Sequence, residues 1–167
     1  TATSTQHQLV KILTEKAIKQ HGERHLPYYR VYDSVQIEIA RVIKPDGRVI
    51  DVAPEDIKDV SAAVLEYMNI FDPDVREKVV AFKGLETGDC IELKYTDHLF
   101  HPPIEGEFDG ADVFQLMDPI LHKVLTINGP ADMPVRHLMQ NGDVKLTSET
   151  VNGRVTYRWE VKDVPRI

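Results

Sequence analysis

The stretch DSVQIEIARVIKPDGRVIDVA, residues 33–53, decides the fold. Apolar and polar residues alternate along its first half, which is the pattern of a half-buried β-strand. One face of that strand is predicted to hold Val35, Ile37, Ile39 and Ile43. In the KPDGR segment, Pro45 and Asp46 favour a tight turn and Gly47 permits a positive φ. Residues 34–53 are therefore predicted to form a β-hairpin.

The second half of the chain repeats this alternating pattern. Four short β-rich runs follow one another: ILHKVLTIN, VRHLMQ, VKLTSETV and RVTYRWEV. Asn141-Gly142 and Asn152-Gly153 separate the last three runs, and Asn-Gly favours two-residue hairpin turns. The runs therefore predict an antiparallel meander. Tyr157 and Trp159 share one face of the last run, and we interpret them as packing residues rather than a ligand platform.

Helix signals are few. Thr14 is suited to an N-cap and Gly22 to a helix stop, so a short helix is predicted over residues 14–21, after a strand near residues 8–13. Pro54 favours a helical turn that begins at its own position. Because many short strands follow one another with little helix, the sequence predicts an all-β fold, an antiparallel β-sandwich with one or two short helices.

Length, charge and hydropathy limit the partners. A chain of 167 residues without a long linker is predicted to form a single β-sandwich domain over residues 1–167. With 20 Lys+Arg against 27 Asp+Glu and no basic block, we expect no nucleic acid partner. No apolar run approaches the roughly 18 residues that a membrane-spanning helix needs, so no membrane span is expected. The start TATSTQHQLV has no initiator Met, and we expect a fragment of a longer chain.

Cys90, the only cysteine, lies in the stretch GLETGDCIELKY. Alternation after it predicts that Cys90 opens a β-strand, on the face of Glu92 and Lys94. A catalytic thiolate usually lies at a helix N-terminus beside a histidine, whereas the carboxylates of Asp89 and Glu92 favour the protonated thiol here. We therefore interpret Cys90 as an unreactive thiol, and a cysteine hydrolase centred on it is a competing hypothesis.

His98 and His101 form a His-x-x-His pair followed by four acidic residues between positions 105 and 112. A zinc site needs three or four converging ligands, and the sequence holds no second histidine pair and no cysteine pair. We interpret the segment as a solvated hairpin loop and expect no metal and no cofactor. Phosphate-binding glycine loops, nucleophile-elbow serines and HExxH are also absent from the sequence, so no catalytic residue is predicted.

Three tyrosines crowd together in the segment LPYYRVY. Tyrosines beside a basic residue suit a glycan or a peptide, although tyrosines next to a strand usually pack against the core. Tyr28, Tyr29 and Tyr32, with Arg30 among them, are therefore the candidate binding patch.

Four ordered fragments together resemble a known bacterial family: ARVIKPDGRVIDV, DPDVREKVVAFKGLETGDCIELKY, FQLMDPILHKVLTIN and YRWEVKDVP. The family is described as domain of unknown function 3857, and the resemblance covers roughly residues 8–165. Positions that match its pattern are Pro45, Asp46, Gly47, Arg76, Gly84, Gly88, Gln115 and Pro119. The resemblance carries over no functional residues, so we interpret these positions as structural.

The resemblance implies a β-sandwich, exported in many members, that precedes a transglutaminase-like domain. We therefore expect a non-catalytic accessory domain, not an enzyme in itself. It would pack on, or present substrate to, a C-terminal transglutaminase-like domain of the same polypeptide, of the cysteine protease or transglutaminase kind. The expected location is periplasmic or extracellular. The alternative is a free-standing glycan- or peptide-binding β-sandwich that uses Tyr28, Tyr29 and Tyr32.

Overall fold

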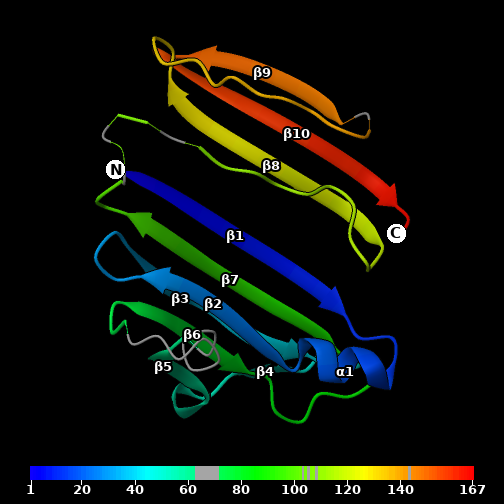
Figure 1. Ribbon diagram of the computed structural model, residues 1–167. Coiled ribbons are helices and arrows are strands. Elements are labelled where there is room, and N and C mark those ends of the chain that lie inside the picture. The colour runs from blue at the N-terminus through cyan, green and yellow to red at the C-terminus, as the bar shows by residue number, and fades with distance from the viewer. Residues whose placement is uncertain (63–71, 103, 105, 108, 143) are drawn as a thin grey trace. The chain divides into compact units, whose positions relative to one another are not determined.

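The computed structural model describes residues 1–62, 72–102, 104, 106–107, 109–142 and 144–167. Antiparallel strands dominate these residues, which confirms the predicted all-β fold with short helical segments (Figure 1). The chain divides into two compact units, unit 1 at Thr1–Phe108 and unit 2 at Asp109–Ile167, and each is described by itself. The single domain over residues 1–167 stays a prediction.

Unit 1 is a sandwich of two antiparallel sheets. The first has the order β1-β7-β3-β4 and the second the order β2-β6-β5. The strands are β1 (Ala2–Lys11), β2 (Glu23–Tyr29), β3 (Asp33–Ile43), β4 (Val49–Asp51), β5 (Ile57–Ser61), β6 (Val75–Ala81) and β7 (Cys90–Leu99). Side chains from these strands and from the segments next to them form one core: Ile12, Leu26, Val35, Val42, Val80, Phe82, Leu85, Ile91, Leu93 and Tyr95. The first strand begins six residues earlier than predicted and ends before Ile12, which is fully buried.

A β-bulge changes the buried face of β3. Val35 and Val42 are both buried although seven positions separate them, an odd spacing that a regular strand would place on opposite faces. The pairing register with β7 shifts between Ile37 and Ile39, which inserts one extra residue and reverses the alternation. The prediction that Ile39 and Ile43 share a face of the strand with Val35 and Ile37 was therefore wrong.

The predicted hairpin and helix are confirmed. β3 and β4 pair across a turn in which Gly47 has φ 87°. The helix α1 (Glu15–His21) follows β1; the hydroxyl of Thr14 accepts a hydrogen bond from the amide of Ala17 at 3.1 Å, and Gly22 closes the other end. A 3-10 turn, η1 (Pro54–Asp56), begins at the proline, as predicted.

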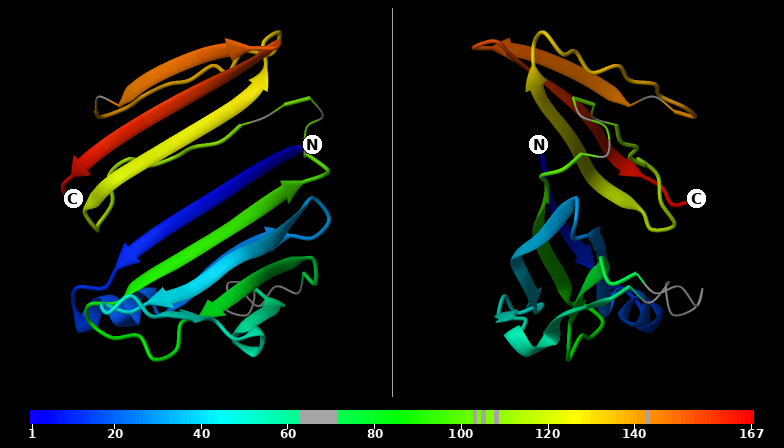
Figure 2. Two further views of the ribbon diagram at one scale, coloured as in Figure 1. Left: turned by 180° about the vertical axis from the view of Figure 1, so that it is seen from behind. Right: turned by 60° about the vertical axis from the view of Figure 1, so that its left-hand side comes forward.

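Unit 2 is one three-stranded sheet made of β8 (Ile120–Pro130), β9 (Lys145–Val151) and β10 (Arg154–Val164). The strands lie side by side in the order β8-β10-β9 in all views (Figures 1 and 2). The predicted meander was wrong, because β10 returns between β8 and β9 instead of following β9 at the edge. Asn152 and Gly153, with φ of 50° and 74°, form the predicted hairpin turn.

The run VRHLMQ, residues 135–140, is not a strand, which corrects the prediction. Both edges of β10 are already paired, with β8 and with β9, so this run has no place beside it. Pro134 before it has no backbone N–H to donate to a ladder. Asn141 has φ 58°, so its turn is present but does not join two strands.

The predicted packing role of the aromatic pair on β10 is confirmed. Trp159 is 4% exposed, and its ring stacks on Tyr157 with centroids 6.0 Å apart. The ring of His137 meets Trp159 edge-on at 5.7 Å. Of the helices in the described residues, none has the length and apolarity to cross a membrane.

Candidate binding site

A tight turn between β2 and β3 brings two tyrosines together at one end of unit 1. Tyr29 ends β2, and its backbone amide donates to the carboxylate of Asp33 at 2.6 Å. The amide of Tyr32 donates back to the carbonyl of Tyr29 at 2.8 Å. As a result, the rings of Tyr29 and Tyr32 have centroids 4.9 Å apart.

Residues that follow β7 extend this aromatic pair. The amides of Phe100 and His101 both donate to the carbonyl of Tyr32, at 3.0 and 3.1 Å, and their own rings meet edge-on at 5.2 Å. Val31 is 44% exposed, while Tyr32 and Phe100 are each 38% exposed. We call Tyr29, Val31, Tyr32, Phe100 and His101 the aromatic patch. Clustered exposed apolar side chains of this kind commonly mark an interaction site.

Carboxylates border the aromatic patch. The hydroxyl of Tyr29 donates to the carboxylate of Asp72 at 3.4 Å, and the negative charge of Asp72 is the main cause that raises the pKa of Tyr29. Asp74 pairs with the guanidinium of Arg30 at 2.5 Å. The only arginine among the patch tyrosines is thus already engaged by a carboxylate.

Asp97 adds a half-buried carboxyl on β7. Burial, followed by the negative charge of Asp33, raises its pKa. Within the described part of the chain, no lysine or arginine forms an ion pair with Asp33, Asp72 or Asp97. This end of unit 1 therefore combines exposed aromatic rings with carboxylates that form no ion pair with a lysine or an arginine of the described residues.

Tyr28 does not join the other two tyrosines. Successive strand residues point to opposite faces, so Tyr28 turns away from Tyr29 and donates to Asp59 at 2.7 Å. Arg76 and Lys78 also bond Asp59, each at 2.9 Å. Partial burial raises the pKa of Asp59, but hydrogen bonds from Tyr28, Lys78 and Arg76 outweigh it and lower the pKa to about 2. Tyr28 thus serves a polar cluster within its own sheet.

Phe100 and His101 were not predicted as members of the patch. Their local signal was the run HLFH, residues 98–101, at the end of a strand, which was interpreted as part of a solvated loop. The contact that assigns them to the patch is made with Tyr32, and sequence pattern alone does not bring these distant segments together.

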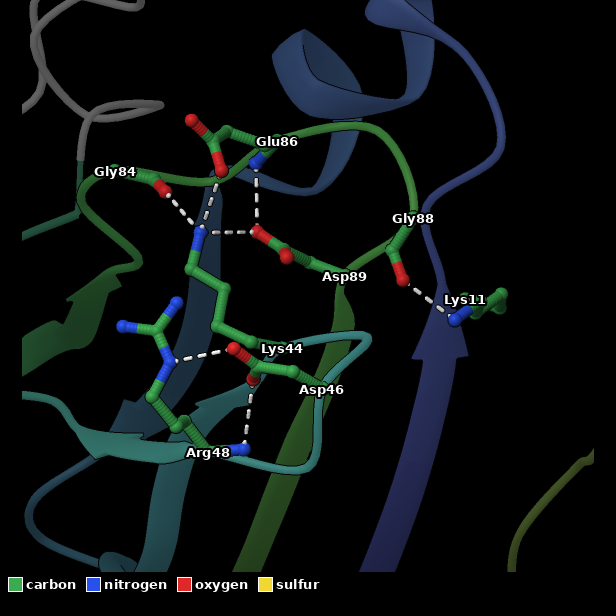
Figure 3. A network of polar contacts seen from close by, with 8 residues as sticks. All are labelled: Lys11, Lys44, Asp46, Arg48, Gly84, Glu86, Gly88 and Asp89. Atoms are coloured by element: carbon green, nitrogen blue, oxygen red, sulfur yellow. Dashed lines mark hydrogen bonds and ion pairs between the residues drawn. The ribbon is translucent and has the colours of Figure 1, made fainter.

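Of the predicted turn residues Pro45, Asp46 and Gly47, Asp46 takes part in the polar contacts shown in Figure 3, through its pair with Arg48. Lys44 reaches from the hairpin to the turn between β6 and β7, where its ammonium donates to Asp89 at 2.9 Å and to Gly84 and Glu86 at 3.0 Å. The side chains of Lys44 and Asp89 are only 11% and 1% exposed. This buried ion pair fixes the hairpin on the neighbouring turn.

Gly88 and Pro45 pack closely in the same region. Gly88 has φ 100°, and a Cβ built on it would lie 3.2 Å from Cγ of Pro45. Asp46 pairs with Arg48 across the turn at 2.7 Å. The geometry around Pro45, Asp46 and Gly47 is that of a structural turn.

Cys90 begins β7, as predicted, on the face of Glu92. Burial raises the pKa of its thiol; the positive charge of Lys11 opposes this and the negative charge of Glu92 adds to it. The thiol contacts the carbonyl of Ile91 at 3.7 Å. A thiol with a raised pKa holds little thiolate at neutral pH, which is the opposite of what nucleophilic catalysis requires.

The two histidines of the His-x-x-His pair lie in different structural elements. His98 belongs to β7, whereas the ring of His101 lies within hydrogen-bond distance of the carbonyl of Val31, at 3.2 Å. In the described ranges, no three His, Cys, Asp or Glu side chains are placed to hold a metal ion. Glu105, from the acidic run that follows, lies outside those ranges.

Comparisons with known proteins give a family and one similar structure. The family model described as "Domain of Unknown Function with solved-structure structure (DUF3857)" matches residues 1–167. A crystal structure titled as that of "a putative protease from Parabacteroides distasonis ATCC 8503" is similar in fold, with a TM-score of 0.83 at 20% sequence identity. The similarity covers 99% of this chain but 32% of that protein, so the chain spans about a third of its length. No curated protein matches.

Proposed function

The chain belongs to the DUF3857 family, and we propose that it is a non-catalytic accessory domain for a transglutaminase-like domain that follows it in the same polypeptide. It packs on that domain or presents substrate to it, in the periplasm or outside the cell. One observation carries the proposal: the similar protein, described as "a putative protease", is about three times as long as the region that this chain matches. The remaining two thirds of such a protein is where a catalytic domain is expected.

Exposed apolar side chains of unit 2 support the packing role. Leu138 is 82% exposed, Leu121 77% and Met117 74%. Residues 113–167 hold further exposed apolar side chains: Val113, Leu116, Val124, Met133, Met139, Val151 and Ile167. Methionine and leucine side chains on a surface suit a protein interface, because they adapt their shape to a partner. Unit 2 therefore supplies a surface on which a following domain can pack.

The complete reading frame is the first test. We expect it to start with an export signal and to continue past Ile167 into a segment that contains the cysteine, histidine and aspartate of a transglutaminase-like site. A frame that stops near Ile167 would contradict the proposal.

The full-length protein provides the second test. Leu138→Asp is expected to lower its peptidase or transglutaminase activity severalfold, because a buried carboxylate weakens an apolar interface. The matched control is Leu13→Asp in unit 1, at a leucine that is 67% exposed. Equal activity of the two variants would count against packing through unit 2.

A second candidate function is a free-standing module that binds a glycan or a peptide at the aromatic patch. The exposed Tyr32 and Phe100 favour it. Arrays of glycans and peptides probed with residues 1–167 are expected to give ligands whose binding is lost in the double variant Tyr29→Ala/Tyr32→Ala. If no ligand on the arrays loses binding in the double variant, the free-standing binding function is contradicted.

A further inference from the structure

We propose that the aromatic patch is a docking surface for a basic peptide segment, whose lysine or arginine side chains lie over the tyrosine rings and face the surrounding carboxylates. The identification of that peptide as the substrate of the following domain rests on the proposed function. Binding of the peptide itself rests on the patch alone.

The tyrosine rings of the patch suit a cation. The ring centroids of Tyr29 and Tyr32 lie 4.9 Å apart, the ring planes are tilted by 39°, and Tyr32 is 38% exposed. The faces of aromatic rings attract ammonium and guanidinium groups through the ring quadrupole. Val31 and Phe100 add apolar contact area beside the rings, which suits the methylene stem of a lysine or an arginine.

Carboxylates beside the rings favour a basic partner. Asp33 and Asp72, which bond the backbone amide and the hydroxyl of Tyr29, have no lysine or arginine partner within the residues that the structure describes, while Asp74 is paired with Arg30. A cation placed between Asp33 and Asp72 gains Coulomb attraction from both carboxylates. The patch therefore has an excess of negative charge that a basic partner complements.

The charge balance of the whole unit points the same way. Residues 1–108 hold 19 Asp+Glu against 13 Lys+Arg, so most of the net charge of -7 belongs to unit 1. Such a field attracts basic segments and repels acidic ones before contact. The carboxylates of Asp33 and Asp72 are hydrogen-bond acceptors, so a partner that bonds them supplies the donors, as ammonium and guanidinium groups do.

Calorimetric titration of residues 1–167 with a heptapeptide of alternating lysine and alanine tests the proposal. We expect binding that weakens at least tenfold in Tyr32→Ala/Phe100→Ala and at least threefold in Asp72→Asn. Raising NaCl from about 50 mM to 0.5 M should weaken it further, because salt screens exposed charges. The matched controls are Val49→Ala and Asp46→Asn, at an exposed apolar and an exposed acidic position in the β3–β4 hairpin.

Four results would overturn the proposal. The first two are no binding of the peptide and equal binding of a peptide with glutamate in place of lysine. The other two are binding of chitotetraose instead of the peptide and loss of peptide binding in the control variants. Should the double variant fail to fold by circular dichroism, the single variants Tyr32→Ser and Asp72→Asn replace it. If the patch variants bind as the wild type does while Leu138→Asp still lowers full-length activity, this inference fails and the proposed function stands.

Discussion

The two units are made of similar alternating sequence but bury their apolar residues very differently. Unit 1 closes two sheets over one core, in which Ile12, Val80 and Leu93 are at most 1% exposed. In the described residues of unit 2, Trp159 is the one buried apolar side chain, and it is 4% exposed. Leu121 and Leu138 in unit 2 are more exposed than any large apolar side chain in the described residues of unit 1.

This difference follows from the number of sheets. A sheet buries one face only when a second layer covers it, and unit 1 has both layers. In its described residues, unit 2 has one three-stranded sheet, which is near the lower limit for independent stability. We therefore expect unit 1 to be stable by itself, and under the proposed function we expect unit 2 to gain stability from the domain that follows.

The largest expected effect is in the hairpin network of unit 1. Lys44→Met leaves the buried carboxylate of Asp89 without its cation, and we expect a loss of about 3–5 kcal/mol in the free energy of unfolding. Arg48→Met is the matched control, because the Arg48 side chain is 73% exposed and its pair with Asp46 should contribute at most about 1 kcal/mol. Urea denaturation measures both variants, and equal losses would show that burial does not set the strength of these pairs.

A core truncation in unit 1 should have the next largest effect. Leu93→Ala is expected to cost about 2–5 kcal/mol, since Leu93 is 1% exposed and the substitution leaves a cavity. Leu121→Ala in unit 2 removes the same atoms from a side chain that is 77% exposed, and should cost under about 0.5 kcal/mol in the isolated chain. Thermal unfolding compares the two variants. A similar cost for both would remove the contrast between the units.

The smallest expected effect concerns pH. The pKa of Asp59 is about 2 in the folded chain, below its ordinary value of 3.8, so its ionised form stabilises unit 1 above about pH 4. That contribution is lost as the pH falls from about 4 to 2. Asp59→Asn should therefore lower the free energy of unfolding by about 1 kcal/mol or less at pH 7, because the side chain is 37% exposed.

At pH 2 the difference between Asp59→Asn and the wild type should become small. In unit 2, Glu160 has a pKa of about 2 through its bonds with Arg158 and His122, so Glu160→Gln provides the parallel measurement. A destabilisation by Asp59→Asn that is the same at both pH values would show that lost packing, rather than lost charge, is its cause.

Local patterns of the sequence predicted the local structure well. Pro45 and Gly47 marked the hairpin, Thr14 and Gly22 bounded the helix, and Asn152 marked the β9–β10 turn, because each residue type has a backbone preference of its own. Such preferences act within a few residues, so a single sequence reveals them.

Features that depend on distant partners were not predictable in this way. The bulge in β3 reveals itself only through its register with β7, and the place of β10 between β8 and β9 depends on pairing across the sheet. The same holds for the binding patch. Tyr29 and Tyr32 were found from their own segment, whereas Phe100 joins them through a backbone hydrogen bond to a residue far away in the chain.

The most direct test uses two probes that the sequence provides, one in each unit. The only tryptophan, Trp159, reports on unit 2 through its fluorescence, and the only cysteine, Cys90, reports on unit 1 through its labelling by a thiol reagent. In a urea titration of residues 1–167, we expect the fluorescence of Trp159 to change at a lower urea concentration than the labelling of Cys90. Coincident transitions would contradict the claim that unit 1 is self-sufficient and unit 2 depends on a partner.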